Sequence, residues 1–260
     1  MTYENLLWEV ADGVGLVTLN RPKVLNALDA RTFEELSDVV GVVERDRGVK
    51  ALVLTGAGEK AFAAGADIAA LSSMGPVEAG RFSELAHRVL ERLERLPVPV
   101  IAAVNGFALG GGCEVVLACD LVYASDRARF GQPEVNLGLV PGFGGSQRLP
   151  RRIGLSRAME MVLTGDMIDA AKAKEIGLAL EVVPGAELLA FARAQAAKIA
   201  SKGPVAVAAA KRIMRAGTEP ELAAANELER QAFAALFGSA DAKEGMAAFL
   251  AKRPAAWKGA

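Results

Sequence analysis

The first half of the chain alternates short apolar runs with longer amphipathic segments. The runs NLLWEVADG and VGLVTLN, at 5–13 and 14–20, meet at Asp12-Gly13 and predict a β-hairpin. The segment DARTFEELSDVVGVVERD predicts a helix with Asp29 as its N-cap. Fully apolar runs predict buried strands at 50–56, 98–106 and 121–125. We therefore expect an α/β fold in which the sheet is parallel apart from the N-terminal hairpin.

From about Ser156 the pattern becomes mainly helical, with one short strand predicted at 178–184, LALEVVP. No linker, low-complexity tract or repeat of fixed period interrupts the chain, which indicates one continuous unit with a helical C-terminal half. Broad Ala-rich apolar faces near the end of the chain suggest packing against another subunit. Each predicted helix ends at a glycine or begins near a proline, as is usual for helices. The predicted helices are 156–165, 169–177, 185–202, 204–217 and 220–238.

Composition narrows the class of protein. The 260 residues carry a formal net charge of -1 with acids and bases interspersed, which gives no electrostatic footprint for nucleic acid or an anionic membrane. The start, MTYENLLWEVADG, lacks the regions of a secretory signal, and no run is apolar and long enough to span a bilayer. Cys113 and Cys119 both lie in an apolar segment, so we expect free thiols and a cytoplasmic location.

The single histidine removes whole classes of mechanism. His87 lies in an amphipathic segment, 81–96, on the side away from the apolar stripe, so we expect it on the solvated face of a helix. With no second histidine, a Ser-His-Asp triad or a zinc site built from imidazoles is excluded. Acid–base chemistry must therefore come from carboxylates, Lys, Tyr or Cys.

Two glycine-rich stretches could approach a ligand. GAGEKA, at 56–61, fits a dinucleotide-binding pattern, but Gly65 interrupts the helix that this motif requires, so the match is weak. The second stretch, Gly110-Gly111-Gly112, follows a predicted strand and opens a short helix to about Cys119. A helix N-terminus offers unpaired N–H groups to an oxygen that develops negative charge. Close helix–strand packing is the other explanation for these glycines.

Two glutamates stand in apolar surroundings. Glu114 is the only ionisable side chain between Asn105 and Asp120, where an idle buried carboxylate would be costly. Glu134 follows Pro133 in a loop, FGQPEVNLGLVPGFGG, and taken alone it is better explained as an acid on a surface loop. Two carboxylates beside one cavity would have their pKa values pushed apart, which yields one acid and one base near neutral pH.

At this point the sequence resembles the crotonase superfamily, and within it the enoyl-CoA hydratases. The resemblance runs from about residue 5 to the C-terminus, and ALGGGCE and GQPE, at matching spacing, are its most specific elements. The other segments that carry it are NRPKVLNALD, FAAGADI, AMEMVLTGD and EGMAAFLAKRPAAW. It implies an α/β crotonase-like spiral of ββα repeats, with residues 1–195 as the core that holds the acyl-CoA site. Residues 196–260 would form a C-terminal helical trimerisation region, giving a homotrimer or homohexamer.

The resemblance also implies a site. The amides of Ala66 and Gly111 would hold the thioester oxygen, Glu114 would activate the attacking water, and Glu134 would give a proton to C2. Coenzyme A enters as part of the substrate, so neither a metal nor a separate cofactor is expected. The residues that match CoA-binding positions are Ala27, Ala64, Ala66, Asp67, Ile68 and Gly111. Many relatives have a lysine after AGADI where this chain has alanines, so Lys23, Lys252 or Lys258 would contact the phosphates.

Two alternatives stay open. A Δ3,Δ2-enoyl-CoA isomerase or another crotonase would use the same oxyanion hole, although such relatives often keep only one of the two glutamates. Some members of the superfamily bind RNA, which would need a basic stripe; charges of both signs along 81–95 disfavour it. The segment LSSMGPVEAGRF, at 71–82, is expected to form part of the acyl pocket wall.

Overall fold

The computed structural model describes residues 2–260, in which the strands form two sheets. The larger sheet has the order β1-β2-β3-β5-β7-β10. Only β1 and β2 pair antiparallel, and every other neighbouring pair is parallel, so the predicted mixed sheet with its N-terminal hairpin is confirmed. The strands are β1 (Leu6–Ala11), β2 (Val14–Leu19), β3 (Ala51–Gly56), β5 (Val100–Val104), β7 (Leu121–Ser125) and β10 (Glu181–Val183).

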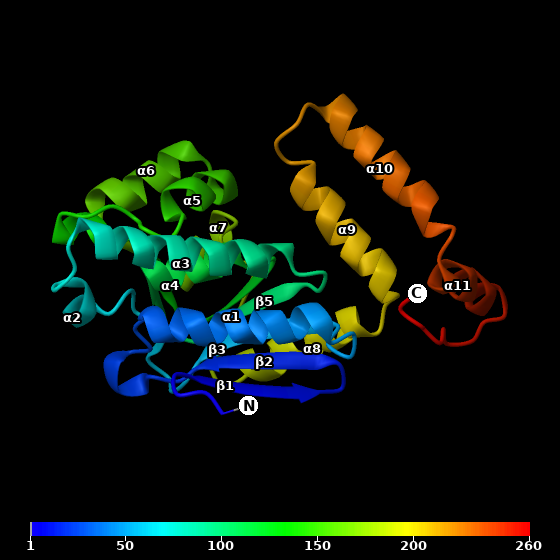
Figure 1. Ribbon diagram of the computed structural model, residues 1–260, viewed down its shortest axis with the longest axis horizontal. Helices are drawn as coiled ribbons and strands as arrows, with labels where there is room; N and C mark the ends of the chain where they lie inside the picture. Colours follow the sequence, from blue (N-terminus) through cyan, green and yellow to red (C-terminus); the bar gives the residue numbers. More distant parts are fainter. Residues whose placement is uncertain (1) are drawn as a thin grey trace.

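The central strands are buried on both faces, which explains their unbroken apolar sequences. Leu52 and Leu54 of β3 join the main core with α1 (Ala30–Arg45) and α3 (Pro76–Arg95). Val53, between them, faces a second cluster with α8 (Leu188–Ala200). Figure 1 shows α1 and α3 lying side by side over the larger sheet. Asp29 caps α1 as expected, by accepting a hydrogen bond from Thr32 N (2.8 Å).

The smaller sheet was not predicted from the sequence. Its strands have three residues each, too few for a pattern of alternating apolar and polar positions to stand out. They are β4 (Ala61–Ala63), β6 (Phe107–Leu109), β8 (Arg129–Gly131) and β9 (Met167–Asp169), in the order β4-β6-β8-β9. The helix α4 (Gly111–Ala118) packs on this sheet, is separated from β6 by one residue, Gly110, and is buried along its whole length. The short strands therefore fix the position of the triple glycine.

Short helices surround α4. α5 (Gly145–Ile153) packs on α4, and α6 (Leu155–Thr164) packs on α5. Two 3₁₀ turns lie in this part, η1 (Pro22–Val24) and η2 (Pro133–Leu137), and η2 occupies a segment that we expected to be a loop. The remaining elements of this part are α2 (Ile68–Leu71) and α7 (Ala170–Glu175).

Three C-terminal helices leave the core: α9 (Pro204–Ala216), α10 (Leu222–Leu236) and α11 (Ala240–Leu250). Figure 1 shows them extending to one side, with α10 beside α9. α9 is held to the body by Lys211, whose Nζ lies 2.8 Å from Asp120 Oδ2 and donates to Val98 O (2.9 Å). The expected division after residue 195 falls inside α8, which packs on the sheet; the projecting helices begin only at Pro204.

None of the helices within residues 2–260 combines the length and the apolar composition that a membrane span requires.

Candidate active site

The start of α4 needs glycine for reasons of its own. Gly110 has a φ of +47°, where a side chain is disfavoured. A Cβ on Gly112 would lie 2.0 Å from the carbonyl oxygen of Ala63 in β4, so only glycine lets α4 approach this strand. Close packing therefore accounts for Gly112. Gly111 stands at the first helical position, where the N–H has no partner within the helix and is available to a ligand.

Glu114 stands in the first turn of α4 and is 1% exposed. Its Oε1 accepts hydrogen bonds from the backbone N–H groups of Phe143 (2.7 Å) and Gly145 (2.6 Å), at the start of α5. Burial raises the pKa of Glu114 to about 7, although these two donors oppose the rise. A carboxyl group with such a pKa can give or take a proton at neutral pH.

Glu134 lies in η2, where Pro133 occupies the first position, and is half-buried. Beside it, the Gln132 side chain is fully buried. With its amide nitrogen turned toward Glu134, Gln132 donates to Oε1 (2.9 Å) and Oε2 (3.1 Å). Burial also raises the pKa of the Glu134 carboxyl.

The two glutamates face the same space. Glu134 Oε1 lies 2.9 Å from the position that a Cβ on Gly110 would take, one helical turn before Glu114. A Cβ on Gly145 would lie 2.5 Å from the terminal amide of Gln132 and 3.0 Å from Glu114 Cγ, so the Gln132 and Glu114 side chains both pack against Gly145. The charge of Glu134 contributes to the raised pKa of Glu114. This pair can remove a proton from one atom and deliver one to its neighbour.

Ala66 leaves its amide unused. A parallel bridge pairs it with Leu28, but the bonds come from the flanking residues: Leu28 N donates to Gly65 O (2.9 Å) and Asp67 N donates to Leu28 O (2.8 Å). Within residues 2–260, no acceptor therefore meets the Ala66 N–H. A Cβ on Gly110 would lie 3.8 Å from Gly65 Cα, so the residues before Ala66 and before Gly111 are in contact. The residues that precede these two amides are thus neighbours at the start of α4.

The segments expected to hold coenzyme A lie against each other. Ala64 N donates to Leu25 O (3.0 Å), which joins 25–28 to 64–67. Ala27 and Ala64 are partly exposed, and Ile68 is 50% exposed, so a ligand can reach them. The Asp67 carboxylate is already engaged: it caps α2 and lies 2.9 Å from Arg21 Nη2.

The other candidates make no hydrogen bond with either carboxylate within residues 2–260. GAGEKA is followed by strand β4 rather than a helix, as its weak match to the dinucleotide motif indicated. His87 is half-buried, with its ring close to Gly144, so it is less solvated than expected. Lys23 is exposed in η1. The segment 251–260 contains Lys252 and Lys258, and Figure 1 shows this segment on the opposite side of the molecule from α2.

Sequence reasoning missed the groups that hold the glutamates in place. Gln132 is part of the GQPE motif, but nothing in the sequence indicates that its side chain is buried beside Glu134. The Phe143 and Gly145 amides were invisible because a backbone group leaves no sequence signal. The one available signal was the pair of glycines in PGFGGSQR, directly before a helix.

Comparison with known proteins gives one consistent result. A family model described as enoyl-CoA hydratase/isomerase matches residues 9–260. A short-chain-enoyl-CoA hydratase of Clostridium acetobutylicum is 47% identical over 97% of both chains. A crotonyl-CoA hydratase of Syntrophomonas wolfei is 45% identical over 98% of both. The crystal structure of an enoyl-CoA hydratase from Bacillus anthracis has a TM-score of 0.96 at 40% identity, covering 99% of this chain and 100% of that one.

Proposed function

The chain belongs to the enoyl-CoA hydratase/isomerase family and is an enoyl-CoA hydratase, and we propose that Glu114 and Glu134 are its acid–base pair. The observation that carries the proposal is that a buried carboxyl group, Glu114, and a half-buried one, Glu134, both with a raised pKa, lie beside the first residues of α4. Its substrate is a 2-enoyl-CoA with a short acyl chain, as the names of the Clostridium and Syntrophomonas relatives suggest.

In the proposed reaction the amides of Ala66 and Gly111 receive the thioester oxygen. As water adds, electron density moves onto this oxygen and makes it an enolate. A hydrogen-bond donor aimed at such a developing charge is typically worth about a hundred- to a thousandfold in rate. The position of Gly111 at the start of α4 adds the positive end of the helix dipole.

The glutamates move the two protons. Glu114 takes a proton from water as the water oxygen bonds to C3. The electrons of the 2,3 double bond move toward the thioester oxygen and return to C2 as that carbon accepts a proton from Glu134. The sum is the addition of one water molecule to give the 3-hydroxyacyl-CoA, and return of the proton from Glu114 to Glu134, through solvent, restores both groups for the next turnover. Because the enolate is stabilised by backbone amides, these steps use no metal or redox cofactor.

The rest of the substrate is proposed to lie over Ala27, Ala64 and Ile68, the reachable surface beside the carbonyl site. Backbone groups of Ala66 and Asp67 complete it, since the Asp67 side chain is taken by Arg21. Lys23 is the phosphate contact available within the same chain. Lys252 and Lys258 belong to the segment 251–260, which lies on the far side of the molecule from α2 in Figure 1, so we propose that they serve the site of a neighbouring chain.

A spectrophotometric assay tests the function. We expect the absorbance of the enoyl thioester to fall on addition of enzyme to crotonyl-CoA, with kcat/KM declining as the acyl chain lengthens. The same preparation is offered a 3-enoyl-CoA, the substrate of the isomerase alternative. If the enzyme converts the 3-enoyl-CoA faster than it hydrates crotonyl-CoA, the isomerase assignment would replace the hydratase assignment.

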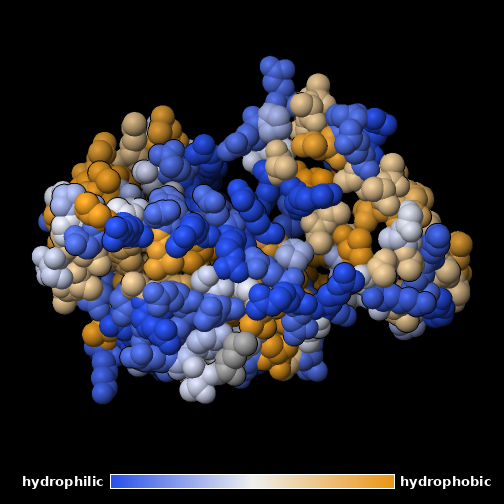
Figure 2. Space-filling model, viewed as in Figure 1, coloured by the Kyte–Doolittle hydropathy of each residue, from blue (hydrophilic) through white to orange (hydrophobic). Residues whose placement is uncertain are grey.

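The C-terminal helices are proposed to assemble the chain into a homotrimer or homohexamer. Figure 2 shows apolar side chains gathered over this region and over α6. In α10 and α11, Phe233, Phe249 and Leu250 are 64%, 82% and 81% exposed, an arrangement typical of an association surface.

Two buried free thiols, Cys113 and Cys119, support the cytoplasmic location that is part of this proposal.

Light scattering after size-exclusion chromatography tests the assembly. We expect a mass of three or six chains for the wild type and a smaller mass for a variant with both Phe249→Asp and Leu250→Asp, since buried charges oppose association. Leu7→Asp, on the edge strand β1 at a residue 53% exposed, is the matched control and should keep the wild-type mass. A monomeric wild type would contradict the proposal.

A further inference from the structure

The turn that holds Glu114 is itself held from its other side. Phe143 donates its N–H to Glu114, while its carbonyl oxygen accepts a hydrogen bond from Arg148 Nη1 (2.8 Å) in α5. Arg148 also packs directly on the turn, because a Cβ on Gly144 would lie 2.1 Å from this same nitrogen. The Arg148 guanidinium group therefore contacts the backbone of Phe143 and of Gly144. The next residue, Gly145, is the second backbone donor to Glu114.

Arg148 has a fixed orientation. Its Nε donates to Glu94 Oε1 (3.0 Å) and its Nη2 to Glu94 Oε2 (2.8 Å), a two-point contact with α3 that sets both direction and distance. The Arg148 and Glu94 side chains are only 16% and 20% exposed. Solvent screening, which weakens most surface ion pairs, is correspondingly reduced here.

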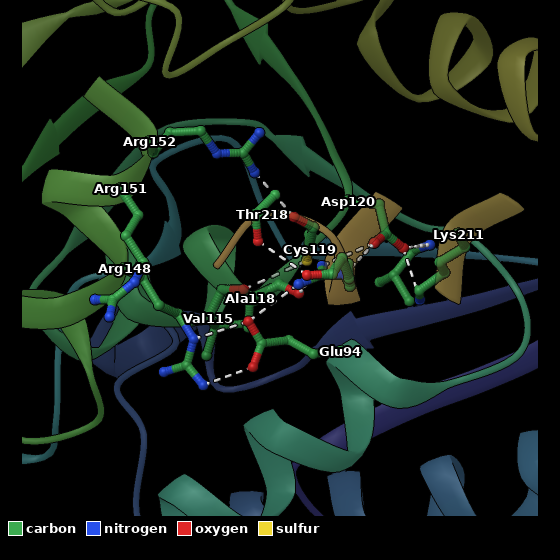
Figure 3. Close-up of polar contacts among 12 residues, drawn as sticks. Glu94, Val115, Ala118, Cys119, Asp120, Arg148, Arg151, Arg152, Lys211 and Thr218 are labelled. Atoms are coloured by element: carbon green, nitrogen blue, oxygen red, sulfur yellow. Dashed lines mark hydrogen bonds and ion pairs between the residues drawn. The ribbon is translucent and has the colours of Figure 1, made fainter. Parts of the chain in front are cut away.

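Glu94 is anchored in turn by the C-terminal part of the chain. Arg215 of α9 donates from Nη1 to Glu94 Oε1 (3.2 Å) and from Nε to Asp120 Oδ1 (2.8 Å). Figure 3 shows this cluster, with Glu94 on one side and Asp120 beside Lys211 on the other. Arg215 also donates to Ala118 O (3.1 Å), at the last residue of α4. The cluster therefore connects the end of the helix that carries Glu114 with the turn that binds it.

From these contacts we infer that Arg148, fixed by Glu94, is a positioning residue for Glu114. The inference rests on the proposed role of Glu114 as the base. Arg148 lies behind the turn and is not placed against the substrate. Without it, the Phe143 carbonyl loses its partner and the turn is free to shift. A displacement of about 1 Å at a catalytic group can lower a rate by about a hundredfold.

Kinetics of variants at Arg148 and Glu94 test the inference. We expect Arg148→Met to lower kcat by about a hundredfold with KM changed less than about threefold, since binding of the substrate is untouched. Arg148→Lys keeps one donor but loses the two-point contact, so its kcat should be about tenfold higher than that of Arg148→Met and still below the wild-type value. Glu94→Gln should lower kcat by about tenfold, because it weakens the two-point contact. Circular dichroism and thermal melting establish that each variant is folded.

Arg151→Met is the matched control. Arg151 lies one turn away in α5 and is exposed; it contacts Gln147 O and Glu219 instead of the turn. It should keep the wild-type kcat. A folded Arg148→Met or Arg148→Lys variant with the wild-type kcat would overturn the inference, and so would an equal loss in Arg151→Met.

A double variant separates this inference from the role of Glu114. If Arg148 acts through Glu114, Arg148→Met should cost less than about threefold in a Glu114→Gln background, because effects on one unit do not add. A further loss of about a hundredfold there would overturn the inference but leave the role of Glu114 intact. Full activity of Glu114→Gln alone would instead remove the proposed role of Glu114 itself.

Discussion

Glu114→Gln is expected to lower kcat for hydration of crotonyl-CoA by about a thousandfold, within the range by which general acid–base groups accelerate reactions, and to leave KM nearly unchanged. Glutamine has the shape of glutamate, and its oxygen can still accept from Phe143 N and Gly145 N. The turn therefore stays in place while the base is lost. A variant that keeps wild-type kcat would contradict the assignment of Glu114.

The pH dependence of the same pair gives a second measurement. Because burial raises the pKa of Glu114 to about 7, we expect kcat/KM of the wild type to rise with pH through about 7, as the carboxyl group becomes a base. Glu114→Gln should lack this rise in its residual activity. A wild-type profile that is flat between pH 6 and about 8 would show that another group limits the reaction.

Stability should change in the opposite direction to activity. Between the ordinary pKa of 4.5 and about 7, unfolded Glu114 loses its proton while folded Glu114 keeps it, so wild-type stability falls as pH rises through this window. The loss is on the order of 3 kcal/mol, at 1.36 kcal/mol for each pKa unit. Glu114→Gln does not have this cost. Its advantage in melting temperature should be largest at about pH 8 and disappear below about pH 5.

Glu134→Gln is the second substitution with a large expected effect, a fall in kcat of about a thousandfold. Glutamine cannot give a proton to C2, although it fits the space beside Gln132. Glu160→Gln, at an exposed position of α6, is the matched control and should leave kcat unchanged. Hydration by Glu134→Gln at the wild-type rate would remove Glu134 from the mechanism.

Exchange of the C2 hydrogens of butyryl-CoA in D₂O distinguishes the two glutamates. This saturated thioester has no double bond to hydrate, so exchange reports only on proton transfer at C2. We expect Glu134→Gln to lose the exchange and Glu114→Gln to retain it, as measured by proton NMR. The reverse pattern would mean that the two roles are interchanged.

The sequence predicted the elements whose pattern is long enough to be distinctive. The hairpin at Asp12-Gly13, the N-cap at Asp29 and the apolar strands that became β3, β5 and β7 all follow from local rules. The helix α3 begins at Pro76, five residues earlier than expected, because its first turn carries little apolar pattern. The second sheet could not be predicted, since strands such as β4 and β6 are defined by their partners and not by their own residues.

The candidate site divides in the same way. Glu114 could be identified from the sequence, because a single charge in an apolar helix is unusual. From the sequence, Gly112 could serve either ligand binding or close packing. The structure favours packing, because a Cβ on Gly112 would lie 2.0 Å from the carbonyl oxygen of Ala63. The Phe143 amide reaches Glu114 from 29 residues along the chain, and Arg148 in turn holds the Phe143 carbonyl, through contacts that only the folded chain creates.

The two short hydrogen bonds to Glu114 have a stereochemical consequence. Phe143 and Gly145 both donate to Oε1, so the lone pairs of that atom are engaged and Oε2 is the more basic of the two oxygens. A nucleophile activated by Oε2 approaches the planar alkene from one side only. The hydroxyl group of the product should therefore be formed as a single enantiomer, because the fixed turn sets the position of the base relative to the bound alkene.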